Sequence, residues 1–496
     1  MMTIVEMLEK NAKLFPQKTS IISEKSKISY ELLYENINTL ANFLIDIGIR
    51  KGDRVGLLLQ KTPELVESFL GVVSAGGVVF PIDFNQTARH IRQLLELTDP
   101  FALIVDATFI PLLSQINFPF SDRQIIVVGH GEEGTHLTWE KVLSNRRPVR
   151  PHVNIRGEDV AYLNLTSGTT GIPKCAITTH DNIYWNTISV VECFKLTAED
   201  THLCMFPPFA HPHEIFARPI YLGGTLVLFD KISPKGIVKA LNDNKVTCFM
   251  AIASIYEALV RYREGTDFNL KFLKLAESGG MHFSPVLAKN FKDLFKIPII
   301  PVWGSTETAG IALAASLSGR QKKGSMGKPC PYYEIKIVND DGEDVPANEI
   351  GEMAIKGPGV CSEYLGNPEE TAKHMREGWF YSGDMVKKDS EGYFYFAGRR
   401  TGMMKVAGLK VFPTEIEDIL SEHPKIAEVA VVKGQDGLHG EVPKAVLVPK
   451  EEMQIDKKEI RKYCEERLSR YKVPRIIEFR SHLPKTPGGK ILWRKL

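Results

Sequence analysis

Tyr162–Lys174, with the sequence YLNLTSGTTGIPK, joins an apolar strand to a loop of small and hydroxyl-bearing residues that ends at a lysine. The loop residues are Thr166, Ser167, Gly168, Thr169, Thr170 and Gly171. Glycines let the backbone turn its amides toward an anion, hydroxyls add donors, and Lys174 adds a mobile positive charge. The stretch therefore predicts a buried strand followed by a phosphate-binding loop.

This loop differs from a Walker motif, which has glycine directly before its lysine and serine or threonine directly after it. Here Pro173 precedes Lys174 and Cys175 follows it. The alternative is a polar surface turn without a ligand. Six small or hydroxyl residues directly after an apolar strand favour phosphate binding over that alternative.

Strand and helix patterns alternate on both sides of the loop. Upstream, an amphipathic segment at 30–48 is followed by apolar strands at 54–59 and 77–83, and a helical pattern follows the loop near 182–194. Alternation of this kind predicts a mostly parallel sheet covered by helices. After about Gly324, short strands separated by Gly, Pro and Asp turns predict a small antiparallel barrel or sheet.

The C-terminal segment has a separate set of strand and helix patterns, large enough for a compact domain. The change in pattern falls at Arg399–Gly402. We therefore predict an N-terminal domain at 1–398 and a C-terminal domain at 399–496. The length of 496 residues also favours a large unit with a smaller one attached.

Composition argues against several classes of protein. Lys and Arg number 62 and Asp and Glu 60, so the net charge of +2 does not favour binding to nucleic acid or an anionic membrane. The seven cysteines are scattered, as expected of free thiols in a reducing compartment. The N-terminus lacks the apolar stretch of a secretory signal, and no apolar run could span a bilayer. We predict a cytoplasmic protein that binds neither nucleic acid nor membrane.

Four further motifs follow the loop in order along the chain: ESGGM at 277–281, VWGSTET at 302–308, YSGDM at 381–385 and FAGRR at 396–400. Together with the loop, this ordered set resembles the adenylate-forming superfamily of acyl-CoA synthetases, aryl-acid ligases and peptide-synthetase adenylation domains. The resemblance extends over essentially the whole chain. It implies an α/β fold, in which a large AMP-binding domain of stacked, mostly parallel sheets with a small β-barrel carries a small, mobile α+β domain.

The resemblance implies a nucleotide pocket at the ends of two predicted strands, where open α/β sheets bind ligands. Its glycines would let the backbone pack against adenine, and its tryptophan would stack on the ring. The residues in this segment are Gly279, Gly280, Trp303, Gly304 and Ser305.

Two neighbouring residues are implied to act in catalysis. Thr306 would contact phosphate, and Glu307 would help hold Mg²⁺, a hard cation that takes oxygen ligands and bridges phosphate oxygens. The alternative for Glu307 is the acidic residue of a helix first turn, since TETAGIALAA could begin a helix there.

The resemblance places Asp384 and Arg399 at the ribose. A carboxylate suits this role because it accepts two hydrogen bonds at once. The alternative for Asp384 is an ordinary turn residue after glycine.

The C-terminal segment carries two lysines that match the family pattern. Lys490, next to two glycines, is implied to be the lysine of adenylation, where it and magnesium would offset charge on the phosphate oxygens. Lys405 lies in KVAGLKVFPTEIE and is assigned to the nucleotide site. Thr401 stands where the family usually has the hinge aspartate. The alternative for Lys490 is a solvated lysine of the chain end.

FPPFAHPHEIF at 206–216 lies where the family lines its acid pocket, and it resembles the aryl-acid form. His211 is the matching histidine, but Pro212 follows it where those enzymes usually have asparagine. The alternatives are a structural histidine, or a metal site shared by His211 and His213.

We therefore predict an acid–thiol ligase that uses ATP and Mg²⁺ to convert a small carboxylic acid to its acyl-adenylate and passes the acyl group to CoA. No enzyme cysteine is needed, because the thiol comes from the acceptor. A carrier-protein phosphopantetheine is the alternative acceptor. The alternative outside the enzymes is a non-catalytic nucleotide-binding protein. Such a protein should have lost Lys490, Glu307 or Asp384, and all three residues are present.

Overall fold

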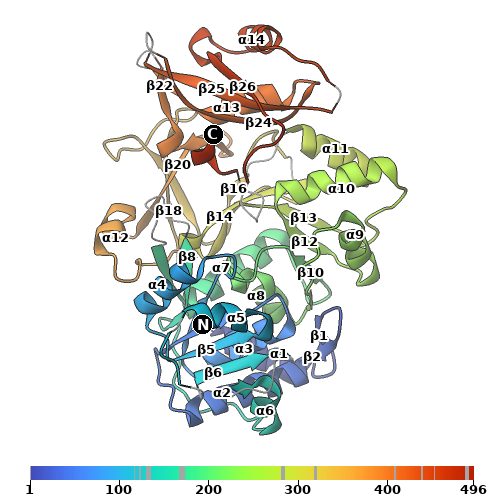
Figure 1. Ribbon diagram of the computed structural model, residues 1–496, viewed down its shortest axis with the longest axis vertical. Helices are drawn as coiled ribbons and strands as arrows, with labels where there is room; N and C mark the ends of the chain where they lie inside the picture. Colours follow the sequence, from blue (N-terminus) through green and yellow to red (C-terminus); the bar gives the residue numbers. More distant parts are fainter. Residues whose placement is uncertain are drawn as a thin grey trace.

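The computed structural model describes most of the chain. The described residues are 2–116, 118–121, 124–129, 136–166, 174–280, 285–317, 321–406, 409–436, 440–451, 453–485 and 491–496. Figure 1 shows the N-terminal sheet at one end of the long axis and the C-terminal strands β24, β25 and β26 at the other.

One sheet has the strand order β7-β6-β5-β3-β4-β8-β9 and is parallel except for the antiparallel pair of β8 and β9. Its strands are rich in buried aliphatic residues, as expected of a parallel sheet covered on both faces. They are β3 (Arg54–Leu58), β4 (Val78–Pro81), β5 (Ala102–Asp106), β6 (Ile125–Val128), β7 (Leu137–Thr138), β8 (Val160–Thr166) and β9 (Lys174–Thr179).

A second sheet has the order β16-β15-β14-β13-β12-β10-β11-β1-β2 and is parallel from β14 to β1. At its other end β14 turns back antiparallel into β15. The strands are β1 (Thr19–Ile22), β2 (Lys27–Ser29), β10 (Thr201–Cys204), β11 (Thr225–Val227), β12 (Cys248–Ala251), β13 (Leu275–Ser278), β14 (Ile299–Ser305), β15 (Gly310–Ala314) and β16 (Lys328–Pro329).

Helices pack between and around these sheets (Figure 1). The ring of Phe69 on α3 packs edge-on against Tyr162 of β8 and Phe216 of α8, with centroids 5.5 and 5.1 Å apart, so helices and both sheets share one core. The helices are α1 (Ile4–Leu14), α2 (Tyr30–Asp46), α3 (Pro63–Ser74), α4 (Ala88–Thr98), α5 (Ile110–Ile116), α6 (Trp139–Ser144), α7 (His180–Phe194), α8 (Pro212–Leu222), α9 (Pro234–Asp243), α10 (Ala253–Gly265) and α11 (Pro285–Phe295).

The segment predicted as a small antiparallel barrel or sheet forms a five-stranded antiparallel sheet. Short strands and tight turns in this part of the sequence favour that local pairing. Its elements are β17 (Glu334–Val338), β18 (Gly351–Lys356), α12 (Pro368–His374), β19 (Met375–Arg376), β20 (Trp379–Lys388) and β21 (Phe394–Arg399).

The C-terminal segment has a hydrophobic core separate from the others, built around Met404, Ile416 and Ile460. The mixed α/β fold with a C-terminal unit is thus confirmed. A short turn at Arg400–Gly402 joins β21 to this unit. Its elements are β22 (Met404–Val406), β23 (Leu409–Val411), α13 (Pro413–Ser421), β24 (Ile426–Asp436), β25 (Gly440–Pro449), α14 (Lys457–Glu465) and β26 (Ile476–Phe479).

Across the described ranges, no helix has both the length and the apolar character needed to cross a lipid bilayer.

Candidate active site

The strand before the predicted phosphate loop is β8, and it forms an antiparallel hairpin with β9. Thr166 ends β8 and pairs with Lys174, the first residue of β9. The loop between them, 167–173, lies outside the described residues, so the predicted roles of Ser167, Gly168, Thr169, Thr170 and Gly171 stay predictions. The hairpin places Lys174 directly at the end of that loop.

Lys174 is held by groups that the sequence patterns did not single out. Its ammonium forms an ion pair with Glu370 of α12 and lies 5.2 Å from the centroid of the Tyr364 ring. The hydrogen bond from Lys174 lowers the pKa of Glu370. Lys174 and, more weakly, His374 at 3.4 Å favour the ionised form of this carboxylate. On the predicted role of Lys174, Glu370 would compete with phosphate for the lysine.

Tyr364 also links Lys174 to Glu307. Its hydroxyl donates to Glu307 Oε1 at 2.6 Å. Burial and the neighbouring Glu307 raise the pKa of Tyr364, so the hydroxyl keeps its proton. The segment after β18 brings the ring there by pairing with β9, since the Leu365 amide donates to the Cys175 carbonyl at 2.8 Å.

Replacing Glu370 by Gln is expected to tighten ATP binding about fivefold. The variant removes an ion pair whose side chains are 13% and 20% exposed, and a pair of this kind contributes about 1 kcal/mol. Lys174 is then available for phosphate without having to leave a carboxylate. Titration calorimetry with ATP measures the change.

Lys174→Ala is the matched control for this experiment and should weaken ATP binding. If Glu370→Gln bound ATP as weakly as Lys174→Ala, Glu370 would hold the lysine ready for phosphate rather than compete with it.

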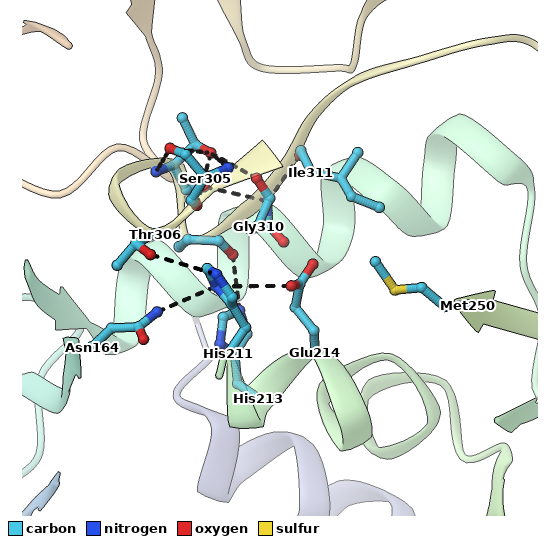
Figure 2. Close-up of polar contacts among 12 residues, drawn as sticks. Asn164, His211, His213, Glu214, Met250, Ser305, Thr306, Gly310 and Ile311 are labelled. Atoms are coloured by element: carbon cyan, nitrogen blue, oxygen red, sulfur yellow. Dashed lines mark hydrogen bonds and ion pairs between the residues drawn. The ribbon is translucent and has the colours of Figure 1, made fainter. Parts of the chain in front are cut away.

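Thr306 and Glu307 lie in a single tight turn, and Figure 2 shows its hydrogen bonds. Ser305 Oγ accepts from the Thr308 amide at 3.3 Å, and Thr308 Oγ1 accepts from the Ser305 amide at 3.0 Å. Thr306–Thr308 form one turn of 3-10 helix with Glu307 as its acidic residue, but the longer helix over TETAGIALAA is wrong, because β15 begins at Gly310 and pairs with β14. The antiparallel pairing with β14 satisfies the backbone groups that a helix would have used.

Glu307 is a single carboxylate, and the described residues contain no group of three His, Cys, Asp or Glu side chains that could hold a metal alone. That donor set does not form an all-protein metal cage. It does fit Mg²⁺, which takes one or two carboxylates together with water and substrate phosphates.

His211 lies between groups from three elements, as Figure 2 shows. Asn164 of β8 donates through Nδ2 to His211 Nδ1 at 3.2 Å, which leaves the proton of a neutral ring on Nε2. Nε2 faces Thr306 Oγ1 at 3.5 Å. On the other side, Glu214 Oε2 of α8 is 3.9 Å from His211 Nδ1. The predicted acid-lining histidine is thus directly beside the predicted phosphate-contacting threonine.

His213 has a different environment and is fully buried. Its Nε2 lies 2.8 Å from the carbonyl of Ala309, which can only accept, so Nε2 carries the proton. Nδ1 therefore accepts from the Tyr162 hydroxyl at 2.7 Å. Both ring nitrogens are hydrogen-bonded, so His213 cannot bind a metal without losing one of these contacts. It ties β8 to the turn that carries Thr306 and Glu307.

The burial of His213 predicts a loss of stability in acid. Burial lowers the pKa of His213 to about 4, whereas an unfolded histidine titrates near 6.5. Between these values the unfolded chain binds the proton and the folded chain does not, so the free energy of unfolding falls as the pH falls from 6.5 to 4. The loss is about 1.4 kcal/mol per pH unit from this residue.

Urea unfolding of the wild type and of His213→Gln across this pH range tests the prediction. The variant should show a shallower pH dependence. Equal slopes for the two proteins would contradict it, since other buried histidines such as His202 are present in both.

A side chain predicted to bind the ribose contacts the side chain predicted to bind adenine. Asp384 of β20 accepts a hydrogen bond from Trp303 Nε1 at 2.7 Å, and Arg399 Nε lies 2.5 Å from its other oxygen. Asp384 is only 1% exposed. Burial raises the pKa of this carboxyl, and Arg399 and Trp303 counteract that shift. Strands far apart in sequence therefore converge on one carboxylate, and its role at the ribose stays a prediction.

Two of the predicted glycines have a clear backbone reason. Gly280 has φ +77°, in the left-handed region, and a Cβ on Gly304 would lie 2.4 Å from the Gly310 carbonyl oxygen. A Cβ on Gly279 would lie 3.0 Å from Val302. Gly304 thus lets β14 approach the start of β15 closely, and Gly279 lies against Val302 of β14. Their contact with adenine stays a prediction.

The predicted lysines of the C-terminal unit are not both described. Lys405 lies exposed on β22, and its amide donates to Glu441 at 2.8 Å. Lys490 lies outside the described residues. Of the predicted site residues, the structure therefore brings together Lys174, Thr306, Glu307, Trp303, Asp384, Arg399 and His211. The role of Lys490 stays a prediction.

Tyr364, Glu370, Asn164 and Glu214 are the candidate site residues that sequence reasoning missed. None of them follows a glycine-rich or hydroxyl-rich pattern, and Tyr364 lies in EYLGNPEET, whose composition is that of an ordinary turn. No local signal in this sequence distinguishes them. Only their contacts with predicted residues do.

Known proteins resemble this chain over its full length. Residues 8–365 match the family model "AMP-binding enzyme", and residues 415–490 match "AMP-binding enzyme C-terminal domain". A long-chain-fatty-acid–CoA ligase of Bacillus subtilis is 31% identical over 100% of this chain and 94% of its own. A feruloyl-CoA synthase of Amycolatopsis is 30% identical over 97% and 96%.

Solved structures agree with this relationship. An anthranilate CoA ligase in complex with anthranoyl-AMP superposes with a TM-score of 0.93 at 28% identity and covers 100% of this chain and 96% of its own. The chain therefore belongs to the adenylate-forming superfamily of AMP-binding enzymes and is an AMP-forming acid–thiol ligase.

Proposed function

We propose that the protein activates a small carboxylic acid with ATP and Mg²⁺ and then transfers the acyl group to CoA. In the first step a carboxylate oxygen attacks the α-phosphorus, an acyl-adenylate forms and pyrophosphate leaves. In the second step the CoA thiolate attacks the acyl carbon and AMP leaves. The main support for the proposal is that three groups of predicted residues lie in one place. Trp303 is hydrogen-bonded to Asp384, the turn with Thr306 and Glu307 follows Trp303 in the chain, and Thr306 lies beside His211.

The side chains divide the first step among them. Asp384 accepts from the ribose hydroxyls, and Trp303 lies against adenine. Lys174 and Thr306 hold phosphate oxygens, while His211 donates through Nε2–H toward the acid carboxylate. Donors placed where negative charge builds up lower the barrier to phosphoryl chemistry. Glu307 would hold Mg²⁺, which when bound neutralises charge on the phosphates.

Lys490 completes the phosphate site from the C-terminal domain in this proposal. The domain extends from 399 to 496, and its motion about the turn at Arg400–Gly402 would bring Lys490 in for adenylation and remove it for thioester formation. Thr401, in place of the usual aspartate, lies at the centre of that turn.

CoA is the acceptor that the relatives support, since those described above are CoA ligases or a CoA synthase. Their names specify a long-chain fatty acid, a feruloyl group and anthranilate, so they leave the acid open. A carrier-protein phosphopantetheine offers the same thiol chemistry and is an outcome of the test below.

The test measures pyrophosphate release and thioester formation with ATP and Mg²⁺ across fatty, aryl and amino acids, each with and without CoA. We expect pyrophosphate release that depends on the acid, and an acyl-CoA product identified by mass. If the acyl-adenylate reacted with a phosphopantetheinylated carrier protein but not with CoA, the carrier protein would be the acceptor in place of CoA. Failure to bind ATP would overturn the proposal.

A further inference from the structure

A buried charged cluster lies next to His211, on the side away from Thr306. It consists of Glu214 and Arg218 of α8 and Glu277 of β13, which are 8%, 5% and 1% exposed. Arg218 Nη1 lies 2.9 and 2.8 Å from the two carboxylate oxygens of Glu277. The guanidinium is thus paired with Glu277. Because the cluster has two carboxyl groups and one cation, one carboxyl group has no cation of its own.

Glu214 is the carboxyl that is left over. Its Oε1 is buried and has no hydrogen-bond partner among the described residues. Its Oε2 is 3.9 Å from His211 Nδ1, which is too long for a hydrogen bond. Burial raises the pKa of Glu214 to about 7. Buried polar atoms are almost always paired, so a carboxyl oxygen beside a reactive centre that is unpaired among the described residues calls for a partner from outside them.

The position of Glu214 relates it to the bound acid. His211 lies between Thr306 on one side and Glu214 on the other (Figure 2). An acid whose carboxylate lies at the Thr306 side and whose body passes the imidazole reaches Glu214. Gly310 packs closely against Glu214, because a Cβ there would come within 2.8 Å of Glu214 Oε1 and 2.7 Å of Asn186 Oδ1. Only glycine at this position leaves the carboxyl oxygen where it is.

We propose that Glu214 is a specificity-determining residue that accepts a hydrogen bond from an amino or hydroxyl group on the body of the acid. This inference rests on the proposed function. The substrate class is a carboxylic acid that bears such a donor, in preference to a plain hydrocarbon acid. A hydrocarbon acid would cover Glu214 without pairing it, and a site built to hydrogen-bond a substrate rejects an analogue that lacks the donor.

The experiment compares acids that differ only in the donor, using acid-dependent exchange of pyrophosphate into ATP. One set is benzoate with its 2-, 3- and 4-amino and hydroxy derivatives, and the other is hexanoate with 6-amino- and 6-hydroxyhexanoate. We expect kcat/KM for at least one donor-bearing acid to exceed that of its hydrocarbon parent by about tenfold or more.

Glu214→Met keeps the size of the side chain and removes the acceptor, so it should abolish or reverse this preference. Glu67→Met is the matched control: Glu67 is also a buried carboxyl, with a pKa raised to about 7, but it lies on α3 and accepts from Asn36. It should leave the preference unchanged. Glu214→Gln keeps an acceptor without the charge, and it should retain preference for hydroxyl acids more than for amino acids.

Each outcome decides the inference. Preference of the wild type for hydrocarbon acids, or an unchanged preference in Glu214→Met, would overturn it and leave the ligase activity standing. Exchange with none of the acids would overturn the inference, and failure to bind ATP as well would overturn the proposed function. If thermal unfolding shows that Glu214→Met does not fold, the inference is judged from the wild type and Glu214→Gln. The quantity compared is the ratio of kcat/KM between each donor-bearing acid and its hydrocarbon parent.

Discussion

Replacing Glu307 by Gln is expected to slow adenylation by about a hundredfold or more, because the amide has the same shape but lacks the negative charge that we propose holds Mg²⁺ at the phosphates. The loss should be partly relieved by raising the magnesium concentration, since the metal then binds through the phosphates alone. The rate of pyrophosphate release as a function of magnesium concentration measures both effects.

Tyr364→Phe is the matched variant for this prediction. It removes the hydroxyl that donates to Glu307 Oε1 and keeps the carboxylate, so we expect a loss of about tenfold or less, in line with a single hydrogen bond. A Glu307→Gln enzyme with the same rate and the same magnesium dependence as the wild type would show that Glu307 does not hold the metal.

Replacing Lys490 by Ala is expected to slow adenylation by about a hundredfold or more and to spare the second step. As the acid attacks, negative charge builds up on the phosphate oxygens, and a positioned ammonium stabilises that charge. In the second step the charge on the departing AMP develops after Lys490 has been removed, as proposed above, so this step does not depend on its ammonium. Pyrophosphate release and thioester formation from synthetic acyl-AMP, measured separately, give the two rates.

Lys485→Ala is a suitable control, because Lys485 lies five positions before Lys490 but forms a surface ion pair with Glu428 at 2.7 Å. We expect this variant to keep both rates near those of the wild type. Equal losses in the two half-reactions of Lys490→Ala, or no loss in either, would show that Lys490 does not act in adenylation.

Much of the fold could be predicted because its signals are local. The apolar runs at 54–59 and 77–83 became β3 and β4, and the amphipathic segment at 30–48 became α2. Whether a segment forms a strand or a helix depends largely on residues within a few positions of one another. The same holds for the motifs, since each keeps its chemical residues within a few positions.

The turn at Glu307 shows where local reasoning is insufficient. TETAGIALAA can form a helix by composition, yet Gly310–Ala314 forms a strand, because β14 offers a partner whose backbone hydrogen bonds extend the sheet. His211 and His213 show the same limit. Two positions apart in sequence, they differ because Tyr162 and Ala309 take both nitrogens of His213, whereas His211 faces Thr306 and Asn164.

The amino-acid sequence by itself determined the α/β class, the order of the elements and the motifs that belong to this superfamily. Tertiary structure alone decided that Tyr364 joins Lys174 to Glu307 and that Glu370 holds Lys174. It also decided that Glu214 Oε1, beside His211, has no hydrogen-bond partner among the described residues. The physical reason is distance along the chain. A strand forms from neighbouring residues, but a contact such as Lys174 with Glu370 depends on how whole sheets pack, which no pattern within one segment specifies.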